Sequence, residues 1–406
     1  MRKKTLLVVL LCLVASAFLF AQPYNIVIKG GHVIDPKNNI DGPMDIAVRD
    51  GKIALVARNI DATGAIQVVD AKGMYVTPGL IDIHVHARPA SLPFVDVFTF
   101  RFGVTTVVDA GSIGWRYFDD FVKNVININE TRVLAFLHVV GEGMRDGPLR
   151  QNLKDMIVRP IVEYAQKYPE YIVGFKIAHY EGHDWTPILR GTEAGRLTNL
   201  PLMVDLGSAT PPLPLDSLFL HYLNPGDIFT HCFAELGGGR ESIVDPKTGQ
   251  LRPFMAAARE RGIKFDVGHG QISFAYSQAA PAFKAGFYPD AISTDIHVAS
   301  LDEARDQLYC MDECLTLGMD FKSVINASTW GPAQIIKRPD LGHLSVGAEA
   351  DIAILTRRTG KFGIFDYLGN KHATDTKLEC EMTIRAGKIV YDMNGIATPA
   401  KLVRSR

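Results

Sequence analysis

Apolar, strand-like runs alternate with helix-like segments through the middle of the sequence. Eight such runs can be counted: IDIHVH (81–86), VTTVVDA (104–110), RVLAFLHVV (132–140), YIVGFKIA (171–178), PLMVDLG (201–207), DIFTHCF (227–233), IKFDVGHG (263–270) and DAISTDIH (290–297). Alternation of this kind indicates parallel βαβ units, and eight such strands close into a barrel. A doubly wound open sheet is the competing arrangement. We therefore predict an α/β chain with a (β/α)8, TIM-like barrel.

Short β segments flank this middle region on both sides. Within residues 24–75, strand-like stretches alternate with Gly, Asp and Asn turn signals. The same pattern is found in ADIAIL (350–355) and MTIRAGKIVYD (382–392). Neither flank is long enough to bury a sheet face alone. We expect one small composite β-sandwich, with its N-terminal part at 22–76 and its C-terminal part at 339–406, beside a barrel at 77–338.

The N-terminus has the composition of an export signal. Basic residues at positions 2–4 precede an uncharged apolar run from Leu6 to Phe20, which is short for a membrane span of about 20 residues. We expect a signal peptide over residues 1–21 and hence an exported protein, with an uncleaved anchor as the alternative. The cysteines of the mature chain are too sparse for a disulfide scaffold, and no chemistry is assigned to them: Cys232, Cys310, Cys314 and Cys380.

The overall charge excludes some classes of partner. Lysine plus arginine (43) nearly balances aspartate plus glutamate (44), so no long-range field draws nucleic acid or an anionic membrane surface. A hydrophobic fraction of 47% with 21% charged residues is that of a globular protein. We expect a small, roughly neutral molecule as the substrate and no stable membrane span after signal cleavage, and we leave assembly into a homo-oligomer open.

Polar residues interrupt the predicted barrel strands at their C-terminal ends. His84 and His86 are two apart on the first strand, so both imidazoles point to the same side and can chelate a metal ion. His231 ends the sixth run and Asp295 the eighth. Because active sites of this barrel are assembled from the C-terminal ends of several strands, we expect these side chains to converge.

Lys176 lies within the fourth run, between Phe175 and Ile177, which places an ammonium in the barrel interior. An unpaired buried cation is costly. The lysine could add carbon dioxide and become a carbamate that bridges two metal ions, it could form a Schiff base as in an aldolase, or it could pair with an acid such as Asp205. The histidine pair favours the carbamate, because an aldolase needs no metal chelate on its first strand.

Together these residues resemble a known family. PGLIDIHVH, the lysine of VGFKIA, THCF and STDIH are similar to the metal-binding motifs of the amidohydrolase superfamily. THCF, DVGHG and STDIH, with GVTTVVDAG after the second strand, resemble its amidohydrolase/deacetylase subgroup, near the dihydroorotases and D-aminoacylases. The resemblance spans essentially the whole mature chain. It implies two divalent metal ions, expected to be zinc: His84, His86 and Asp295 would hold the more buried ion, carboxylated Lys176 would bridge, and His231 would help to hold the second.

One position departs from the family pattern. A histidine is usual on the fifth strand, where this chain has Asp205 in PLMVDLG. A carboxylate can still bind a divalent metal ion, as a harder and anionic ligand. Alternatively the second ion is held weakly, or His179 or His183 reaches in from the loop after the fourth strand.

Two further residues are candidates for contact with substrate at the mouth of the barrel. His269, in DVGHG, and Ser273 are predicted to contact the substrate, with a histidine bonded to backbone as the alternative. The remaining histidines lie in ordinary contexts and receive no role: His32, His138, His221, His343 and His372.

The predicted reaction is hydrolysis of an amide bond in a small acylated compound, such as an N-acyl amino acid. The two metal ions would create a bridging hydroxide at neutral pH, polarise the scissile carbonyl and orient it, and Asp295 would pass the proton to the leaving group. Hydrolysis of a small ester, or of a cyclic amide as in a dihydroorotase, is the alternative, and a deaminase is less favoured. A non-catalytic barrel paralogue is the competing hypothesis from another class, because Asp205 alters the ligand set. Loops such as 145–151 and 235–250 are expected to form the substrate pocket.

Overall fold

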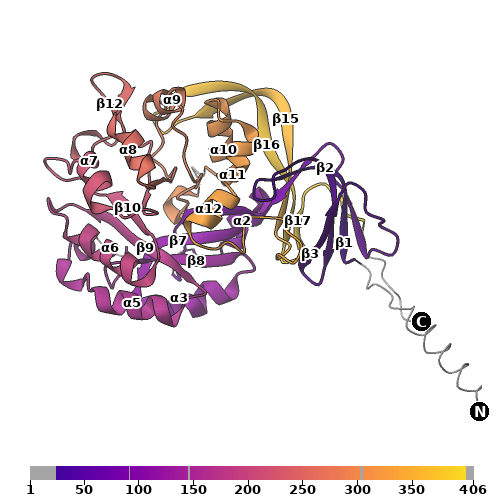
Figure 1. The fold of residues 1–406 in the computed structure, drawn as a ribbon, viewed down its shortest axis with the longest axis horizontal. Coiled ribbons are helices and arrows are strands. Elements are labelled where there is room, and N and C mark those ends of the chain that lie inside the picture. Colours follow the sequence, from indigo (N-terminus) through magenta and orange to yellow (C-terminus); the bar gives the residue numbers. More distant parts are fainter. Residues whose placement is uncertain (1–23, 91, 145–146, 302–304, 399–406) are drawn as a thin grey trace, which may run out of the picture.

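The computed structural model describes residues 24–90, 92–144, 147–301 and 305–398. Figure 1 shows two parts side by side, a ring of helices around parallel strands and a smaller, all-β part formed from both ends of the chain. The predicted signal peptide at 1–21 lies outside the described residues. Among the helices that are described, none combines the length and apolar character needed to cross a membrane.

Seven parallel strands form the hydrogen-bonded sheet of the barrel, in the order β14-β11-β10-β9-β8-β7-β6. Their bounds are Leu80–Val85 (β6), Val104–Gly114 (β7), Arg132–His138 (β8), Ile172–Tyr180 (β9), Leu202–Leu206 (β10), Ile228–Phe229 (β11) and Lys264–Phe265 (β14). These strands coincide with the first seven predicted runs. The later strands are short because their C-terminal residues turn into the loops that carry the site.

The eighth predicted run closes the barrel by single bridges rather than by a continuous ladder. Ala291 pairs in parallel with Asp266, just beyond β14, and Ile296 pairs in parallel with Val85 on β6. The segment 290–297 therefore lies between the last strand of the sheet and the first. The predicted TIM-like barrel is confirmed.

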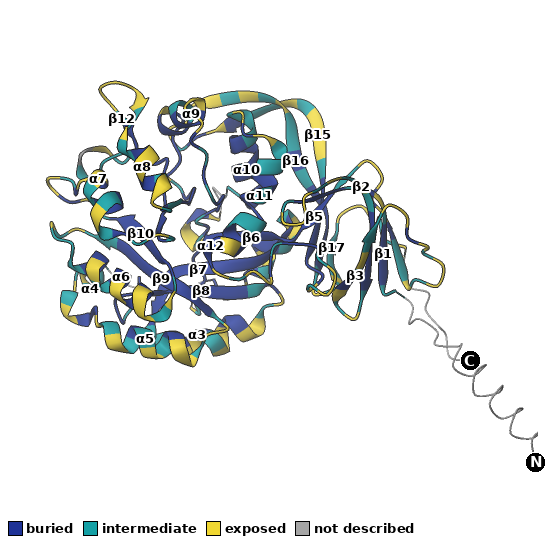
Figure 2. Cartoon of the chain, in the orientation of Figure 1, coloured by how far each residue is buried: buried dark blue, intermediate teal, exposed yellow. Residues whose placement is uncertain are grey.

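Helices cover the outside of the barrel, with their apolar faces turned inward (Figure 2). In α5, for example, Ile161 and Ala165 are buried while most of the helix is partly or fully exposed. The helix bounds are Asp96–Thr99 (α2), Phe118–Asn124 (α3), Gly147–Arg150 (α4), Val158–Lys167 (α5), Thr186–Thr198 (α6), Leu215–Ser217 (α7), Phe254–Glu260 (α8), Tyr276–Lys284 (α9), Gln307–Thr316 (α10), Phe321–Asn326 (α11) and Trp330–Ile335 (α12).

The smaller part is a mixed sheet in the order β17-β16-β15-β5-β1-β2-β3, with β4 added to β1. The bounds are Ile26–Asp35 (β1), Ile40–Arg49 (β2), Lys52–Ala57 (β3), Gln67–Asp70 (β4), Tyr75–Pro78 (β5), Ile352–Phe365 (β15), Lys371–Arg385 (β16) and Lys388–Asp392 (β17). β5 and β15 pair antiparallel, which joins the two ends of the chain. The composite β domain predicted from the two flanks is thus present, whereas its exact boundaries remain a prediction.

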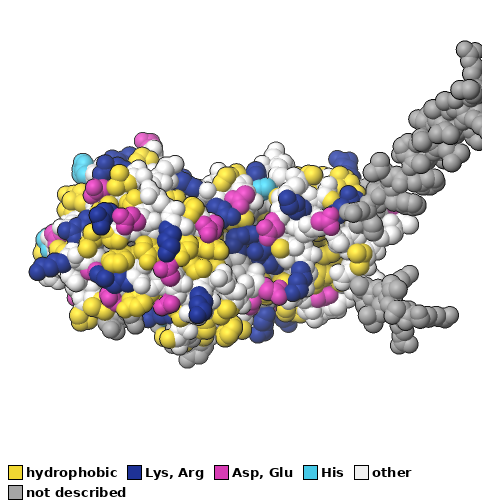
Figure 3. Space-filling model, turned by 90° about the horizontal axis from the view of Figure 1, so that it is seen from below, with side chains coloured by type: hydrophobic (Ala, Val, Ile, Leu, Met, Phe, Trp, Pro, Cys, Tyr) yellow, Lys and Arg dark blue, Asp and Glu magenta, His cyan; other side chains and the backbone are white. Residues whose placement is uncertain are grey.

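The hairpin of β15 and β16 extends from this sheet onto the barrel. The backbone N–H of Leu378 donates to the carboxylate of Asp312 on α10, and the hydroxyl of Tyr276 on α9 donates to the carbonyl of Ile364 at 3.2 Å. The face shown in Figure 3 carries basic and acidic side chains mixed along its length, as the near balance of charges in the sequence suggests. The four described cysteines are buried and free.

Candidate metal centre

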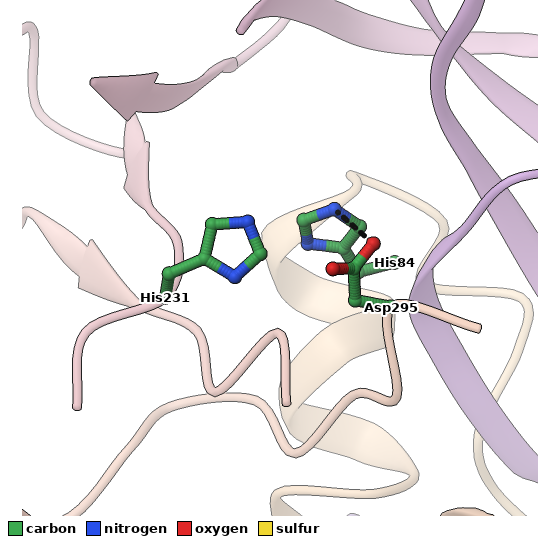
Figure 4. A group of neighbouring side chains, drawn as sticks. All are labelled: His84, His231 and Asp295. Atoms are coloured by element: carbon green, nitrogen blue, oxygen red, sulfur yellow. Dashed lines mark ion pairs between the residues drawn. The ribbon is translucent and has the colours of Figure 1, made fainter. Parts of the chain in front are cut away.

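Side chains from three barrel segments meet at one end of the barrel (Figure 4). His84 lies on β6, His231 follows β11, and Asp295 lies on the closing segment 290–297. One ligand atom of each lies within 4.8 Å of the others. His86 joins this group, with Nε2 3.1 Å from Oδ1 of Asp295. The structure therefore brings together the residues that the sequence predicted to converge.

The backbone takes up unusual conformations where it delivers these side chains. His231 and Asp295 both have a φ of 53°, in the left-handed region that residues other than glycine rarely adopt. Gly268 leaves space beside His231 and His84, because a β-carbon there would lie 2.9 Å from Nδ1 of His231 and 3.0 Å from Nδ1 of His84. The glycines of the DVGHG motif therefore serve the packing of the site.

Hydrogen bonds at Nδ1 orient the two histidines of β6. Nδ1 of His84 lies 2.8 Å from the hydroxyl of Thr230, which itself donates to Oδ2 of Asp266 at 2.7 Å. Nδ1 of His86 lies 2.9 Å from the hydroxyl of Ser112. Contacts of this kind fix the ring orientation of a metal-binding histidine. In both rings Nε2 is left facing Asp295.

The protonation states suit metal binding. Burial lowers the pKa of His86 to about 3, so its imidazole is neutral near pH 7 and its ring nitrogen can act as a ligand. Burial opposes ionisation of Asp295, but His84 and His86 hold the pKa of that carboxyl below its usual value. Neutral imidazole nitrogens beside an ionised carboxylate are a donor set that zinc and similar divalent ions accept. The residues therefore fit the metal that the motifs implied.

Lys176 is fully buried on β9 and points into the same site. Its Nζ lies 3.1 Å from Nε2 of His84 and 3.5 Å from Sδ of Met203. Burial lowers the pKa of this amine. Among the described residues no carboxylate forms an ion pair with it, so the pairing with Asp205 considered from the sequence is absent from this part of the chain.

Asp205, at the departure from the family pattern, has other partners. Its Oδ2 lies 2.9 Å from Nε2 of His179 and 3.6 Å from Nε2 of His231, and its Oδ1 lies 3.3 Å from Nη1 of Arg240. Although burial opposes ionisation, His179 and His231 hold the pKa of Asp205 well below its usual value. Of the two histidines considered from the loop after the fourth strand, His179 reaches the site, while His183 is exposed.

A cavity of about 310 Å³ opens over this end of the barrel, and two of the described arginines lie in its wall. The described residues that line it are His86, Arg88, Met144, Arg150, His179, Asp205, His231, Asp295, His297, Val298 and Ala299. Nη2 of Arg88 donates to the carbonyl of Met144 at 2.6 Å, and Nη1 of Arg150 lies 2.6 Å from Nδ1 of His179. Neither arginine was predicted from the sequence to line the site. The position of Arg88, two residues after His86, was the available signal.

The two predicted pocket loops contribute unequally. From the loop 145–151, Arg150 lines the cavity, while residues 145 and 146 lie outside the described residues. None of the described side chains of 235–250 lines the cavity. That loop instead supplies Arg240, which is buried behind Asp205.

His269 and Ser273, predicted to contact substrate, do not border the cavity. The His269 ring is buried, stacks on Phe274, and places Nε2 2.9 Å from Oε2 of Glu313 on α10. Its Nδ1 lies 2.8 Å from the carbonyl of Gly270. His269 therefore has the backbone-bonded surroundings that are the alternative interpretation of its sequence context.

Comparison with known proteins yields relatives over nearly the whole chain. Residues 292–391 match the amidohydrolase family. A deacetylase of Brucella anthropi is 32% identical over 377 residues, which is 90% of this chain and 92% of that protein. The crystal structure of an adenine deaminase has a TM-score of 0.83 and 28% identity, covering 91% of this chain and 100% of that one. The crystal structure of a dihydroorotase has a TM-score of 0.79 and 27% identity, covering 90% of this chain and 99% of that one.

Proposed function

We propose, because this chain belongs to the amidohydrolase superfamily, that it removes the acyl group from a small N-acylated compound that carries a carboxylate. The chain is a metal-dependent hydrolase that acts on a carbon–nitrogen bond, as its deacetylase and dihydroorotase relatives indicate. Cleavage of a small ester or of a cyclic amide is compatible with the same site. The observation that carries the proposal is the convergence of His84, His231 and Asp295 beside a cavity walled by arginines.

The arginines in the cavity wall favour a substrate that carries a carboxylate. Arg88 and Arg150 line the cavity that also contains Asp295. A guanidinium binds a carboxylate through paired, charge-assisted hydrogen bonds. An N-acyl amino acid could therefore present its amide to the metal centre and its carboxylate to the wall. This refines the expectation of a neutral substrate, because the net charge of the whole chain does not report the local charge of its cavity.

The residues divide into two groups around the metal sites. His84, His86 and Asp295 would hold the more buried ion. His231 would hold the second ion, and Asp205 and His179 lie close enough to His231 to complete this second site. Bound divalent ions supply a nucleophile at neutral pH and polarise the scissile carbonyl. Zinc is the expected ion, because imidazole nitrogens and carboxylate oxygens together suit it.

Lys176 is proposed to carry a carbamate. Its Nζ lies 3.1 Å from Nε2 of His84 and has no carboxylate partner among the described residues. The lone pair of the unprotonated amine would bond to the carbon of carbon dioxide, and one N–H proton would pass to solvent. The product carries one negative charge shared by two oxygens, which would place an anion beside the metal ligands where the free side chain offers only an amine.

Asp295 is proposed to move the proton. Its Oδ1 lies 3.1 Å from Nε2 of His86 and 3.4 Å from Nε2 of His84, on the side of the predicted ion. Its carboxylate also lines the cavity, where a substrate would lie. It could accept a proton from the attacking water and return it to the leaving nitrogen, as a general base and then a general acid.

A substrate screen with metal analysis tests the proposal. We would assay N-acetyl amino acids, the matching N-acetyl amines without a carboxylate, cyclic amides and small esters, with zinc or manganese and with bicarbonate present. Near two ions per chain and a preference for the N-acetyl amino acids are expected, and the preference should weaken in R88M. Equal rates with and without the carboxylate would refute the substrate class. A chain that binds no metal would support the non-catalytic alternative.

Export is a separate proposal, which the N-terminal sequence supports. Basic residues at positions 2–4 precede the apolar run from Leu6 to Phe20. Full-length protein expressed in a bacterial host should lose residues 1–21 and be recovered outside the cytoplasm. N-terminal sequencing that finds Met1 intact in the membrane fraction would favour an anchor instead.

A further inference from the structure

We infer that His138 is a positioning residue whose Nε2–H donates a hydrogen bond to a carbamate on Lys176. The inference rests on the proposed carboxylation of that lysine. The sequence context of His138 suggested no role, and the residue does not line the substrate cavity. Three observations about its surroundings support the inference.

The first observation is the strand register. His138 is the last residue of β8, is buried, and pairs with Lys176 on the parallel strand β9. The backbone N–H of Val139 donates to the carbonyl of Lys176 at 3.0 Å, which continues this pairing. Paired residues on neighbouring strands point to the same face of a sheet. Because Lys176 reaches His84 in the barrel interior, His138 also faces the interior.

The second observation is the close approach of the two side chains across Gly111 on β7. A β-carbon built on Gly111 would lie 2.6 Å from both Cβ and Cγ of Lys176 and 3.1 Å from Cδ2 of His138. The stem of the lysine and this edge of the imidazole therefore border the same small space. Nε2 is bonded to Cδ2, so it belongs to the ring edge that borders this space.

The third observation is a buried hydrogen-bond donor without an acceptor. The backbone N–H of Val140 donates to Nδ1 of His138 at 3.0 Å, so Nδ1 carries no proton and the neutral ring carries its proton on Nε2. Nε2 is buried and has no hydrogen-bond partner among the described residues. Buried donors in native proteins are nearly always paired. An anionic oxygen on the neighbouring lysine would supply a strong acceptor.

The test measures the carbamate directly rather than through activity. Metal-stripped protein would be reloaded with zinc over a series of ¹³C-bicarbonate concentrations, and the carbamate carbon followed by ¹³C NMR. H138F keeps a ring of similar size but removes the N–H, whereas H138Q places an amide N–H near the position of Nε2. In H138F, we expect the bicarbonate concentration that gives half of the maximal carbamate signal to rise about tenfold or more. The reason is that hydrogen bonds to charged groups are among the strong ones.

Control variants separate the hydrogen bond from general effects of substitution. H138Q should stay within about threefold of wild type, because the donor is restored. H343F replaces another buried histidine, whose Nε2 lies 3.1 Å from the carbonyl of Pro339, and should leave the bicarbonate dependence unchanged. If H138F does not fold, H138N takes its place. The shorter asparagine amide reaches the position of Nδ1 rather than that of Nε2, so H138N should need more bicarbonate to form the carbamate, whereas H138Q should not.

The outcomes distinguish the inference from the proposal beneath it. Absence of a carbamate signal in wild-type protein would reject the carboxylated lysine itself. A normal carbamate in H138F, with wild-type bicarbonate dependence, would overturn only the role of His138. A normal carbamate combined with a raised KM would likewise overturn it, because His138 would then act on the substrate.

Discussion

Oδ2 of Asp295 lies 2.5 Å from the point where a β-carbon on residue 270 would be, and residue 270 is glycine. Gly270 has a φ of 53°, and so does Asp295. The backbone at Gly270 thus passes close to the carboxylate proposed to move the proton, and a side chain at this position would meet it. The position of this carboxylate depends on the absence of a single methyl group.

Gly270→Ala should therefore lower turnover by about tenfold or more, because the new methyl displaces Asp295 and small misplacements of reacting groups are costly. The measurement is kcat together with the melting temperature. Gly286→Ala is the matched control, since Gly286 also has a positive φ of 76° but a β-carbon there would meet nothing within 4 Å. Equal activity losses in the two variants would show that backbone strain alone is responsible.

Asp295→Asn should lower kcat by about 100-fold or more, as expected for loss of a general acid and base, while the barrel stays folded. The control is Asp290→Asn at the opposite end of the same segment. Asp290 accepts from the backbone N–H of Phe265 at 2.9 Å, so its replacement should reduce stability and spare turnover. A wild-type rate in D295N would remove this residue from the mechanism.

Lys176→Ala should abolish hydrolysis, and short carboxylic acids such as acetate or propionate should restore part of it. The added acid would place two oxygens where the proposed carbamate stands, in the space left by the truncated side chain. Rates would be measured across a series of acid concentrations, with wild-type protein as the reference. Unchanged turnover in the variant without added acid would reject the bridging role.

Asp205→His should destabilise the protein by about 3–5 kcal/mol, because the buried guanidinium of Arg240 loses its carboxylate partner. Adding Arg240→Met should recover much of this loss. In the double variant a histidine stands where the family usually has one, so bound zinc per chain should equal or exceed the wild-type value if Asp205 is a ligand. Zinc analysis and thermal unfolding provide the two readouts, and loss of zinc in the double variant would assign Asp205 another task.

Asp312→Asn should change how stability depends on pH. Burial raises the pKa of Asp312 from 3.8 to about 7. Between about pH 4 and pH 7 the folded state then binds more protons than the unfolded state, so the free energy of unfolding falls as pH rises through this window. The variant should be more stable than wild type by on the order of 1–3 kcal/mol at pH 8 and similar to it at pH 4. A difference in melting temperature that is independent of pH would contradict this.

Much of the site could be predicted because its determinants are local or repeat with a fixed period. The chelating geometry of His84 and His86 follows from two-residue spacing on a strand, which any strand preserves. The positions of Lys176, His231 and Asp295 at strand ends follow from the order of apolar runs, and parallel strands bring such ends to one edge. The pairing of the two β flanks followed from the need of each to bury a face.

The sequence by itself thus determined the barrel, the composite β domain and the residues that converge at the strand ends. Only the tertiary structure decided that Arg240 faces Asp205, that Arg88 and Arg150 line one cavity, that His269 turns to Glu313 and that Nε2 of His138 lacks an acceptor. The physical reason is that loop and side-chain contacts across the barrel have no period along the chain. Which charges meet is fixed only when the packed strands set the distances between them.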